Sequence, residues 1–298
     1  MTVDGVRWQE IFTGEDPQLA GAAAPGRELA SARALTPHLH RLFFDGGTVF
    51  GDPRTGQPFL ATGPRYVSLP AYVEIMTGRA SGCAGNDCQP ALPWTLAGQL
   101  AHPASPNDTA VFASWPTIAL ALPQGDDLHL STGRHQNDGA DGDTAFPGHG
   151  DYRPDARTAP LALAHLVRHR PHMLWIALGD TDEHAHRGDY PAYLDALRFA
   201  DAFVGQLCAQ LDRMGDYGRR TTVLVTTDHG RDPGFTDHGG PDSAPVWLMA
   251  RGGPLRPKGP QGLPRPRYLR DIAPTVARLY GLGSASCDTC GAVLDELL

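Results

Sequence analysis

Two short apolar runs, each followed by acidic and imidazole side chains, dominate the pattern of this chain. The first run covers residues 173–178 and the second covers residues 221–227. Short apolar runs bounded by turn residues are typical of buried parallel strands. Between them, apolar residues recur at helical spacing from Pro191 to Met214, which predicts an amphipathic crossover helix that packs on the core.

The same alternation continues through the rest of the chain. Apolar runs predict strands near residues 109–122 and 245–250, and helical patterns cover residues 26–44, 68–78, 159–168 and 270–282. Strands that alternate with helices predict a three-layer α/β/α sandwich with a mostly parallel central sheet. Because no linker divides the 298 residues, we expect one domain over 1–298, with a long substrate-facing loop around 123–157.

Polar groups follow both of the apolar runs. Asp180 and His184 follow the first run, Asp228 and His229 follow the second, and His238 comes ten positions after Asp228. The carboxyl ends of neighbouring parallel strands are where open α/β sheets bind ligands. Carboxylates and imidazoles are donors for Zn²⁺, and they also suit Mn²⁺ or Fe²⁺. These donors exceed what one tetrahedral ion needs, so we expect two divalent ions about 4 Å apart.

The alternative interpretation treats these residues as structural. Asp180 and Asp228 would then be helix N-caps after a strand, and the histidines would be ordinary loop residues. Two such clusters, together with the nearby His238-Gly239-Gly240, favour the metal interpretation. His135, His149 and Asp151 in the long loop are weaker candidates for metal ligands.

Ser68 opens a predicted helix in which Pro70 fits the first turn and Gly78 ends the pattern. A serine at this place lies among free backbone N–H groups, a position that stabilises an alkoxide and favours an anionic substrate. The alternative is that Ser68 is only the N-cap of the helix. Asp4 lies at a turn between the end of a very short strand and a helix, and taken alone it is more typical of a simple turn or cap residue than of a ligand. Because only three residues precede it, we expect that part of the strand is missing before Met1, and the missing residues could have included a signal peptide.

Composition narrows the class of function. The net charge of −8, without a basic run, argues against a nucleic acid as a scaffold partner but leaves a nucleotide open as a small substrate. No apolar stretch is long enough to span a bilayer, and the first residues lack the features of a signal peptide.

The five cysteines include two pairs that are close in sequence. Cys83 lies five positions before Cys88, and Cys287 lies three positions before Cys290, while Cys208 lies on a predicted helix. We expect two local disulfides rather than a structural zinc site, and therefore a periplasmic or secreted location, with the cytoplasm as the alternative.

The motifs together resemble those of the alkaline phosphatase superfamily, over nearly the whole chain and in the same order. This superfamily includes phosphatases, nucleotide pyrophosphatase/phosphodiesterases, sulfatases and cofactor-independent phosphoglycerate mutases. The resemblance rests on five motifs: Asp4-Gly5-Val6-Arg7, Ser68-x-Pro70 with Thr77-Gly78, Asp180-x-x-x-His184, Asp228-His229-Gly230 with His238-Gly239, and the helix that begins Arg270-Asp271-Ile272-Ala273-Pro274-Thr275.

The resemblance implies a ligand set and a mechanism. It assigns Asp180, His184 and His238 to one metal, and Asp4, Asp228 and His229 to the other, with Ser68 bridging or facing both. It also implies that Ser68 forms a phosphoseryl intermediate, which water then hydrolyses. Asn86 is the candidate for the side chain that holds the transferring phosphoryl oxygen, with an ordinary turn residue as the alternative.

The resemblance also ranks the possible reactions. Sulfatases need an Arg four positions after the modified Cys or Ser, and this chain has Tyr72 there. The mutases carry a large inserted domain, for which no stretch of this chain is long enough. A phosphodiesterase acting on a small phosphorylated substrate is therefore expected first, and a phosphomonoesterase or a sulfatase-like hydrolase second. From another class, a non-catalytic relative that binds a phosphorylated ligand or a protein is the remaining alternative.

Overall fold

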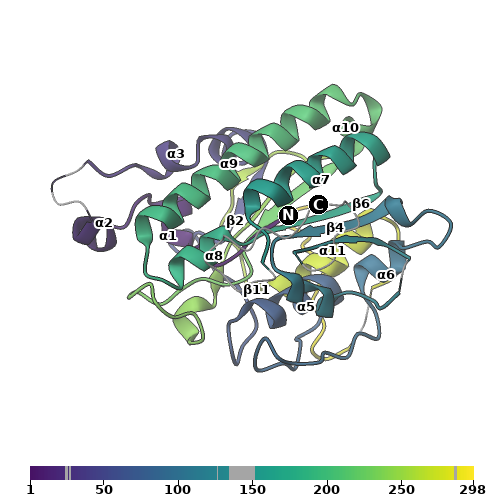
Figure 1. Ribbon diagram of the computed structural model, residues 1–298, viewed down its shortest axis with the longest axis horizontal. Helices are drawn as coiled ribbons and strands as arrows, with labels where there is room; N and C mark the ends of the chain where they lie inside the picture. The colour runs from purple at the N-terminus through teal and green to yellow at the C-terminus, as the bar shows by residue number, and fades with distance from the viewer. Residues whose placement is uncertain (24–25, 27, 126, 134–151, 285–286) are drawn as a thin grey trace. The chain divides into compact units, whose positions relative to one another are not determined.

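The computed structural model describes residues 1–23, 26, 28–125, 127–133, 152–284 and 287–298 (Figure 1). The chain forms two compact units. The first unit consists of Met1–Thr2, Ala61–Gly179 and Tyr268–Leu294, and the second consists of Val3–Leu60, Asp180–Arg267 and Asp295–Leu298. Each unit is therefore assembled from segments that are far apart in the sequence.

The first unit is built on parallel strands. Strand β4 (Thr109–Ala113) pairs in parallel with β5 (His129–Ser131) and with β6 (Met173–Leu178). All five residues of β4 are buried, which explains why its sequence is a continuous apolar run rather than an alternating one. Helix α7 (Asp155–His169) packs along β4 and β6, as Figure 1 shows.

Helix α5 (Ser68–Thr77) carries the predicted nucleophile at its first residue. All ten of its residues are buried, and it packs against η5 (Leu269–Asp271) and α11 (Ile272–Leu279). Gly78 ends the helix in the left-handed conformation, with φ of 68°, which a residue with a side chain adopts only at a cost. The predicted helix from Ser68 to the Gly78 stop is therefore confirmed.

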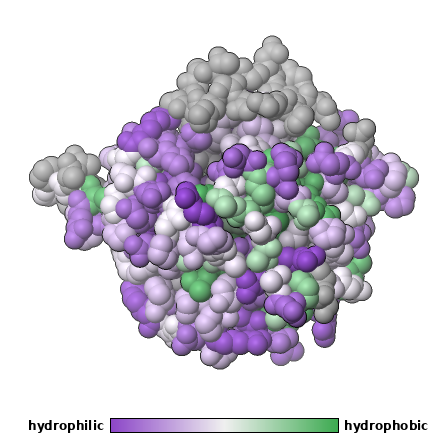
Figure 2. All heavy atoms as spheres, turned by 90° about the horizontal axis from the view of Figure 1, so that it is seen from below, coloured by the Kyte–Doolittle hydropathy of each residue, from purple (hydrophilic) through white to green (hydrophobic). Residues whose placement is uncertain are grey.

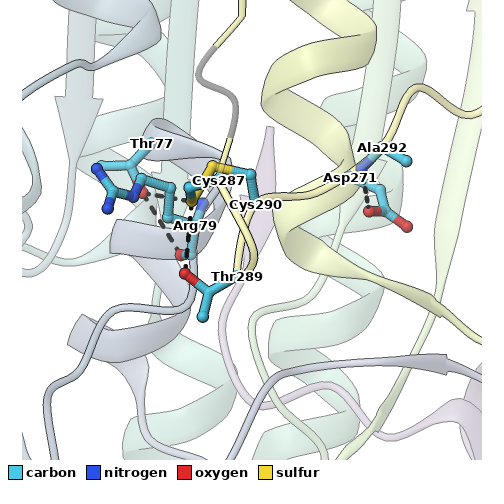
Figure 3. The surroundings of a disulfide bond; sticks show 7 residues. All are labelled: Thr77, Arg79, Asp271, Cys287, Thr289, Cys290 and Ala292. Carbon is cyan, nitrogen blue, oxygen red and sulfur yellow. Dashed lines mark hydrogen bonds between the residues drawn. A yellow bond between two sulfur atoms is a disulfide. The ribbon is translucent and has the colours of Figure 1, made fainter.

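Both predicted disulfides are present in the first unit, between Cys83 and Cys88 and between Cys287 and Cys290, and Cys208 is a buried free thiol. Figure 3 shows the second disulfide beside Thr77, the last residue of α5, and Arg79, which comes two positions later.

Hydrogen bonds tie the segment that follows this disulfide to both helices. The Gly291 N–H donates to the Gly78 carbonyl at 2.8 Å. The Ala292 N–H donates to an Asp271 carboxylate oxygen at 2.8 Å, as Figure 3 shows. The carboxyl-terminal segment thereby holds the end of α5 against the start of α11.

The second unit contains a mixed sheet. Strand β9 (Leu248–Gly252) is antiparallel to both β7 (Thr222–Thr226) and β2 (Thr48–Phe50), and β2 is parallel to β10 (Gly259–Pro260). The predicted crossover is α9 (Tyr190–Arg213), whose inward stripe includes Tyr193, Leu197, Val204 and Leu211. The antiparallel direction of β9 was not predicted, because an apolar run does not encode the direction of a strand.

The remaining elements are short. In and next to the first unit they are β1 (Thr2–Val3), α6 (Leu96–Leu100), η2 (Pro106–Asp108), η3 (Pro116–Ala121) and β11 (Arg267–Tyr268). In the second unit they are α1 (Trp8–Phe12), α2 (Pro17–Ala23), α3 (Ala32–Leu35), α4 (Pro37–Leu39), η1 (His40–Phe44), β3 (Phe59–Leu60), α8 (Asp180–Ala185), α10 (Asp216–Arg220), η4 (Pro241–Ser243) and β8 (Pro245–Val246). The fold is a mixed α/β fold with a large, mostly parallel central sheet, as the sequence predicts.

The surface carries few large apolar side chains. Among the described residues, the exposed ones are Leu29, Val167, Phe199, Tyr280 and Leu298. On the face drawn in Figure 2, hydrophobic residues lie between hydrophilic ones. None of the helices in the described parts of the chain combines the length and the apolar character that crossing a membrane requires.

One buried acid in α5 makes the stability of the protein depend on pH. Glu74 is fully buried, and its carboxylate accepts hydrogen bonds from the Thr62 N–H at 3.0 and 3.2 Å. Burial raises the pKa of Glu74 from 4.5 to about 8, against the opposing effects of Thr62 and the positive charge of Arg270. The folded state therefore keeps a proton that the unfolded state releases between these two pH values.

We expect the protein to lose stability as the pH rises from 5 to 8, because the full contribution of protonated Glu74 is present only below pH 4.5. The Glu74 contribution to this loss is on the order of 3 kcal/mol. In Glu74→Gln that contribution is absent, so urea unfolding at pH 5 and pH 8 should show a smaller loss in the variant. Equal losses in the parent and the variant would show that Glu74 does not carry a raised pKa.

Candidate metal centre

The candidate metal centre lies in the second unit and is built from four segments. Asp4 follows β1, Asp182 lies on α8, and Asp228 and His229 follow β7. His238 lies in the loop before η4. Each of these five side chains is buried, although carboxylates and imidazoles usually remain at the surface.

The side chains form two overlapping groups. Ligand atoms of Asp182, His229 and His238 all lie within 4.8 Å of one another, and so do those of Asp4, Asp228 and His229. His229 belongs to both groups. Two sets of three donors that share one imidazole have the composition expected of a centre for two ions.

His229 is oriented by its own neighbours. Its Nδ1 lies 2.9 Å from the Gly230 carbonyl, and this bond assigns the proton to Nδ1. The other ring nitrogen, Nε2, lies 3.4 Å from Asp4 Oδ1 and 3.4 Å from Asp228 Oδ2. The His229 ring also stacks on the His238 ring, with the ring centroids 4.1 Å apart. The lone pair of Nε2 is therefore directed at the carboxylates, as a metal ligand requires.

Gly5 allows the two groups to approach each other. Its N–H donates to Asp228 Oδ1 at 3.0 Å, and its φ of 64° lies in the left-handed region. A Cβ atom at this position would lie 2.4 Å from Asp182 Oδ1. Only glycine therefore fits between Asp182 and Asp228 without displacing a carboxylate.

His186 reaches the first group from the end of α8. Its Nε2 lies 2.8 Å from Asp182 Oδ2 and 3.3 Å from His238 Nε2. The His186 side chain is 46% exposed, so the centre has one ligand candidate that faces solvent. Asp182, His186 and His238 thus direct one donor atom each toward a common point.

The donors fit divalent cations. Asp228 Oδ2 is buried and accepts no hydrogen bond from the described residues. Burial, followed by the charge of Asp182, raises the pKa of Asp228 to about 6, and burial lowers the pKa of His229 to about 4. Burial opposes ionisation of Asp182, but the Arg231 charge and the bond from His186 outweigh it and hold the pKa of Asp182 below its usual range. Such a concentration of buried carboxylates is costly unless a cation balances it.

Comparison with known proteins identifies the family. The family model for type I phosphodiesterase/nucleotide pyrophosphatase matches residues 92–243, which is half of the chain. The chain belongs to this family. The predicted membership of the alkaline phosphatase superfamily is confirmed, and the chain is a hydrolase of that superfamily.

Solved structures of the superfamily share its fold. A putative sulfatase from Bacteroides thetaiotaomicron is 14% identical, with a TM-score of 0.63 over 98% of this chain and 72% of the sulfatase. Murine ectonucleotide pyrophosphatase/phosphodiesterase 5 is 11% identical, with a TM-score of 0.60 over 97% and 96% of the two chains. Phosphonate monoester hydrolase from Silicibacter pomeroyi is 14% identical, with a TM-score of 0.53 over 98% and 74%. The search of curated proteins found no match.

The structure brings together four of the seven residues that the sequence predicts as metal ligands. Asp4, Asp228, His229 and His238 lie in the two groups. Asp180 and His184 belong to neither group among the described residues, and the first group contains Asp182 instead, with His186 against it.

The two candidate pairs have the same spacing, which explains why the pattern alone did not separate them. Asp180 and His184 are four residues apart, and so are Asp182 and His186. A shift of two residues turns a side chain by about 200° around an α-helix, so Asp180 and Asp182 lie on opposite faces of α8, and His186 is the residue that follows this helix. Asp180 and His184 were assigned from the resemblance to the superfamily motif, whereas in the structure Asp182 is the residue of α8 that lies with His229 and His238.

Ser68 and Asn86 lie in the first unit. Ser68 is the first residue of α5 and is buried, and the residue before it, Val67, is the N-cap. The N–H of Leu69 donates to Asn86 Oδ1 at 2.9 Å, so Asn86 lies next to the start of α5. The Cys83–Cys88 disulfide closes the short loop that contains Asn86. The other candidate ligands, His135, His149 and Asp151, lie outside the described residues, as does most of the predicted substrate loop.

Proposed function

We propose that the protein hydrolyses phosphate diesters with a two-metal centre and Ser68 as the nucleophile. The observation that carries this proposal is the pair of buried ligand groups that share His229, in a chain of the type I phosphodiesterase/nucleotide pyrophosphatase family. In the proposed assignment, Asp182, His186 and His238 hold one ion, and Asp4, Asp228 and His229 hold the other. Zn²⁺ suits these nitrogen and oxygen donors best, with Mn²⁺ or Fe²⁺ as alternatives.

Two bound divalent ions supply Lewis acidity, which makes an attacking hydroxyl more acidic and balances the negative charge of the transferring group. The protein residues do the rest. In the first step, the Ser68 oxygen gives up its proton to solvent and forms a bond to phosphorus, while the bond from phosphorus to the leaving oxygen breaks and the leaving group departs as an alcohol after taking up a proton. In the second step, water attacks phosphorus, the bond from phosphorus to the Ser68 oxygen breaks, and a proton from the water restores the Ser68 hydroxyl as the phosphate monoester leaves.

The start of α5 suits this role. Ser68 is the first residue of a ten-residue helix, where the helix dipole gives a partial positive charge. Asn86 adds a side-chain amide, and because its Oδ1 already accepts the Leu69 N–H, its Nδ2 is the group that can donate to a phosphoryl oxygen. We propose that Asn86 stabilises the transferring group in this way.

The expected substrate is a small phosphorylated molecule with a singly charged ester group. Tyr72 occupies the position where sulfatases have an Arg, and this favours an unmodified Ser68 over one converted to formylglycine. Sulfate esters are therefore minor candidates, and phosphate monoesters rank between the two. The two disulfides favour an oxidising compartment, so we propose a periplasmic or secreted location.

The test compares three p-nitrophenyl esters: the phosphate diester, the phosphate monoester and the sulfate. Each is incubated with the protein after chelator treatment and after addition of Zn²⁺ or Mn²⁺, and release of p-nitrophenol is followed. We expect metal-dependent turnover with the highest kcat/KM on the diester. Faster turnover of the monoester or the sulfate would reassign the substrate, and no turnover with either ion would favour a non-catalytic binding protein.

A further inference from the structure

Arg231 is a buried cation directly beside the candidate metal centre. It follows Asp228-His229-Gly230 in the chain, and its side chain is fully buried in the second unit. Burying a guanidinium is expensive unless a charged or hydrogen-bonding partner compensates for the lost water. The partners of Arg231 therefore indicate why the chain keeps this residue at this place.

The partners of Arg231 converge on Asp182. Its Nη2 donates to Asp182 Oδ1 and, at 3.3 Å, to the Asp182 carbonyl. Its Nη1 donates to the Phe235 carbonyl at 3.2 Å, and the guanidinium lies over the Phe235 ring, 5.7 Å from the centroid. Because the guanidinium is planar and its donors have fixed directions, these contacts hold both Arg231 and Asp182 in one orientation.

The two carboxylate oxygens of Asp182 have different partners. Oδ1 bonds to Arg231, whereas Oδ2 lies 2.8 Å from His186 Nε2. Gly5 packs beside Oδ1, where a Cβ at position 5 would lie only 2.4 Å from this oxygen, so the glycine leaves room for the bond between Oδ1 and Arg231. Oδ2 is consequently the oxygen that faces His186 and His238.

We propose that Arg231 is a positioning residue. It holds Asp182 so that only the Oδ2 atom of Asp182 faces the ion assigned to Asp182, His186 and His238. This inference rests on the proposed two-metal function. The fixed positive charge of Arg231 also offsets the repulsion among the buried carboxylates of Asp4, Asp182 and Asp228 before an ion binds. Residues that orient metal ligands typically contribute 10-fold to 100-fold to metal affinity or activity.

The test measures metal affinity, separately from activity. Chelator-treated parent, Arg231→Met and Arg231→Lys are titrated with Co²⁺, and binding is followed by calorimetry and by visible absorption. We expect Arg231→Met to bind one Co²⁺ about 10-fold to 100-fold more weakly and the other as tightly as the parent does. His186→Ala removes a ligand from the ion that Arg231→Met is expected to weaken. The Co²⁺ that stays tightly bound should therefore give the same spectrum in both variants. The same affinity as the parent for both ions would overturn the inference.

Arg267→Met is the matched control. Arg267 is also buried, and it pairs with Glu296 through two hydrogen bonds, of 3.1 and 2.5 Å, but Glu296 is not a ligand candidate. We expect this variant to bind both ions as the parent does, although it loses a buried arginine. If Arg231→Met does not fold, Arg231→Lys tests the positioning role, because a lysine keeps the positive charge but cannot donate to Asp182 and Phe235 at the same time as the planar guanidinium does. Weaker binding of one ion supports the inference, and unchanged binding overturns it.

The outcomes separate this inference from the proposed function. If the parent itself binds no metal, the proposed two-metal function fails. If the parent binds two ions and Arg231→Met binds them equally well, only the positioning role of Arg231 fails.

Discussion

Ser68→Ala should abolish metal-dependent hydrolysis, lowering kcat by at least about 10⁴-fold. The reason is that alanine removes the oxygen that forms the bond to phosphorus, and the start of α5 offers no other hydroxyl at that position. The measurement is p-nitrophenol release from the preferred ester at saturating metal. Circular dichroism and the metal content of the variant establish that the loss does not come from unfolding.

Two further variants serve as a control and as an intermediate case for the effect of Ser68→Ala on kcat. Ser105→Ala removes a serine that also stands at the start of a short helix in the first unit without a side-chain capping bond, and we expect it to retain the activity of the parent. Asn86→Ala should lower kcat by about 10²-fold to 10³-fold, because it removes a single donor to the transferring group. A Ser68→Ala variant as active as Ser105→Ala would exclude the serine nucleophile.

Asp182→Asn should remove most of the activity and weaken one of the two metal sites, whereas Asp180→Asn should leave both nearly unchanged. The difference follows from the geometry. A carboxylate oxygen of Asp182 lies within 4.8 Å of ring nitrogens of His229 and His238, whereas Asp180 belongs to neither ligand group among the described residues. We expect kcat to fall by about 10²-fold or more in Asp182→Asn, since a ligand has a larger effect than the residues that orient it. Metal content and kcat are measured for both variants.

The histidines provide the same comparison independently. His186→Ala should resemble Asp182→Asn, and His184→Ala should resemble the parent. If instead the variants at Asp180 and His184 lost metal, the assignment of the first ion would return to the pair that the sequence motif first indicated.

Much of the fold follows from the sequence because its strands and helices have strong local patterns. The continuous apolar run at Met173–Leu178 became β6 with the same bounds, and Ser68, Pro70 and Gly78 marked both ends of α5 correctly. Local patterns do not specify which strands pair or in which direction. The antiparallel placement of β9 depends on contacts with β7 and β2 over long sequence distances.

The candidate site shows the same division. Asp228-His229-Gly230 begins two residues after the end of β7, so its position at a strand end was predictable from the apolar run alone. Asp182 and His186 were not separable from Asp180 and His184, because the difference is a rotation around α8 and depends on where His229 and His238 lie. Arg231 carried no sequence signal at all, since its role depends on a contact with Asp182, 49 positions away in the chain.

The central claim is that this chain holds two divalent ions, and the most direct test counts them. Chelator-treated protein is titrated with Zn²⁺, bound metal is measured by mass spectrometry after removal of free ions, and hydrolysis of the diester is measured at each step. The two-metal account predicts that binding saturates at two ions per chain and that activity reaches its plateau at the same point. Saturation at one ion with full activity, or full activity without any bound metal, would contradict it.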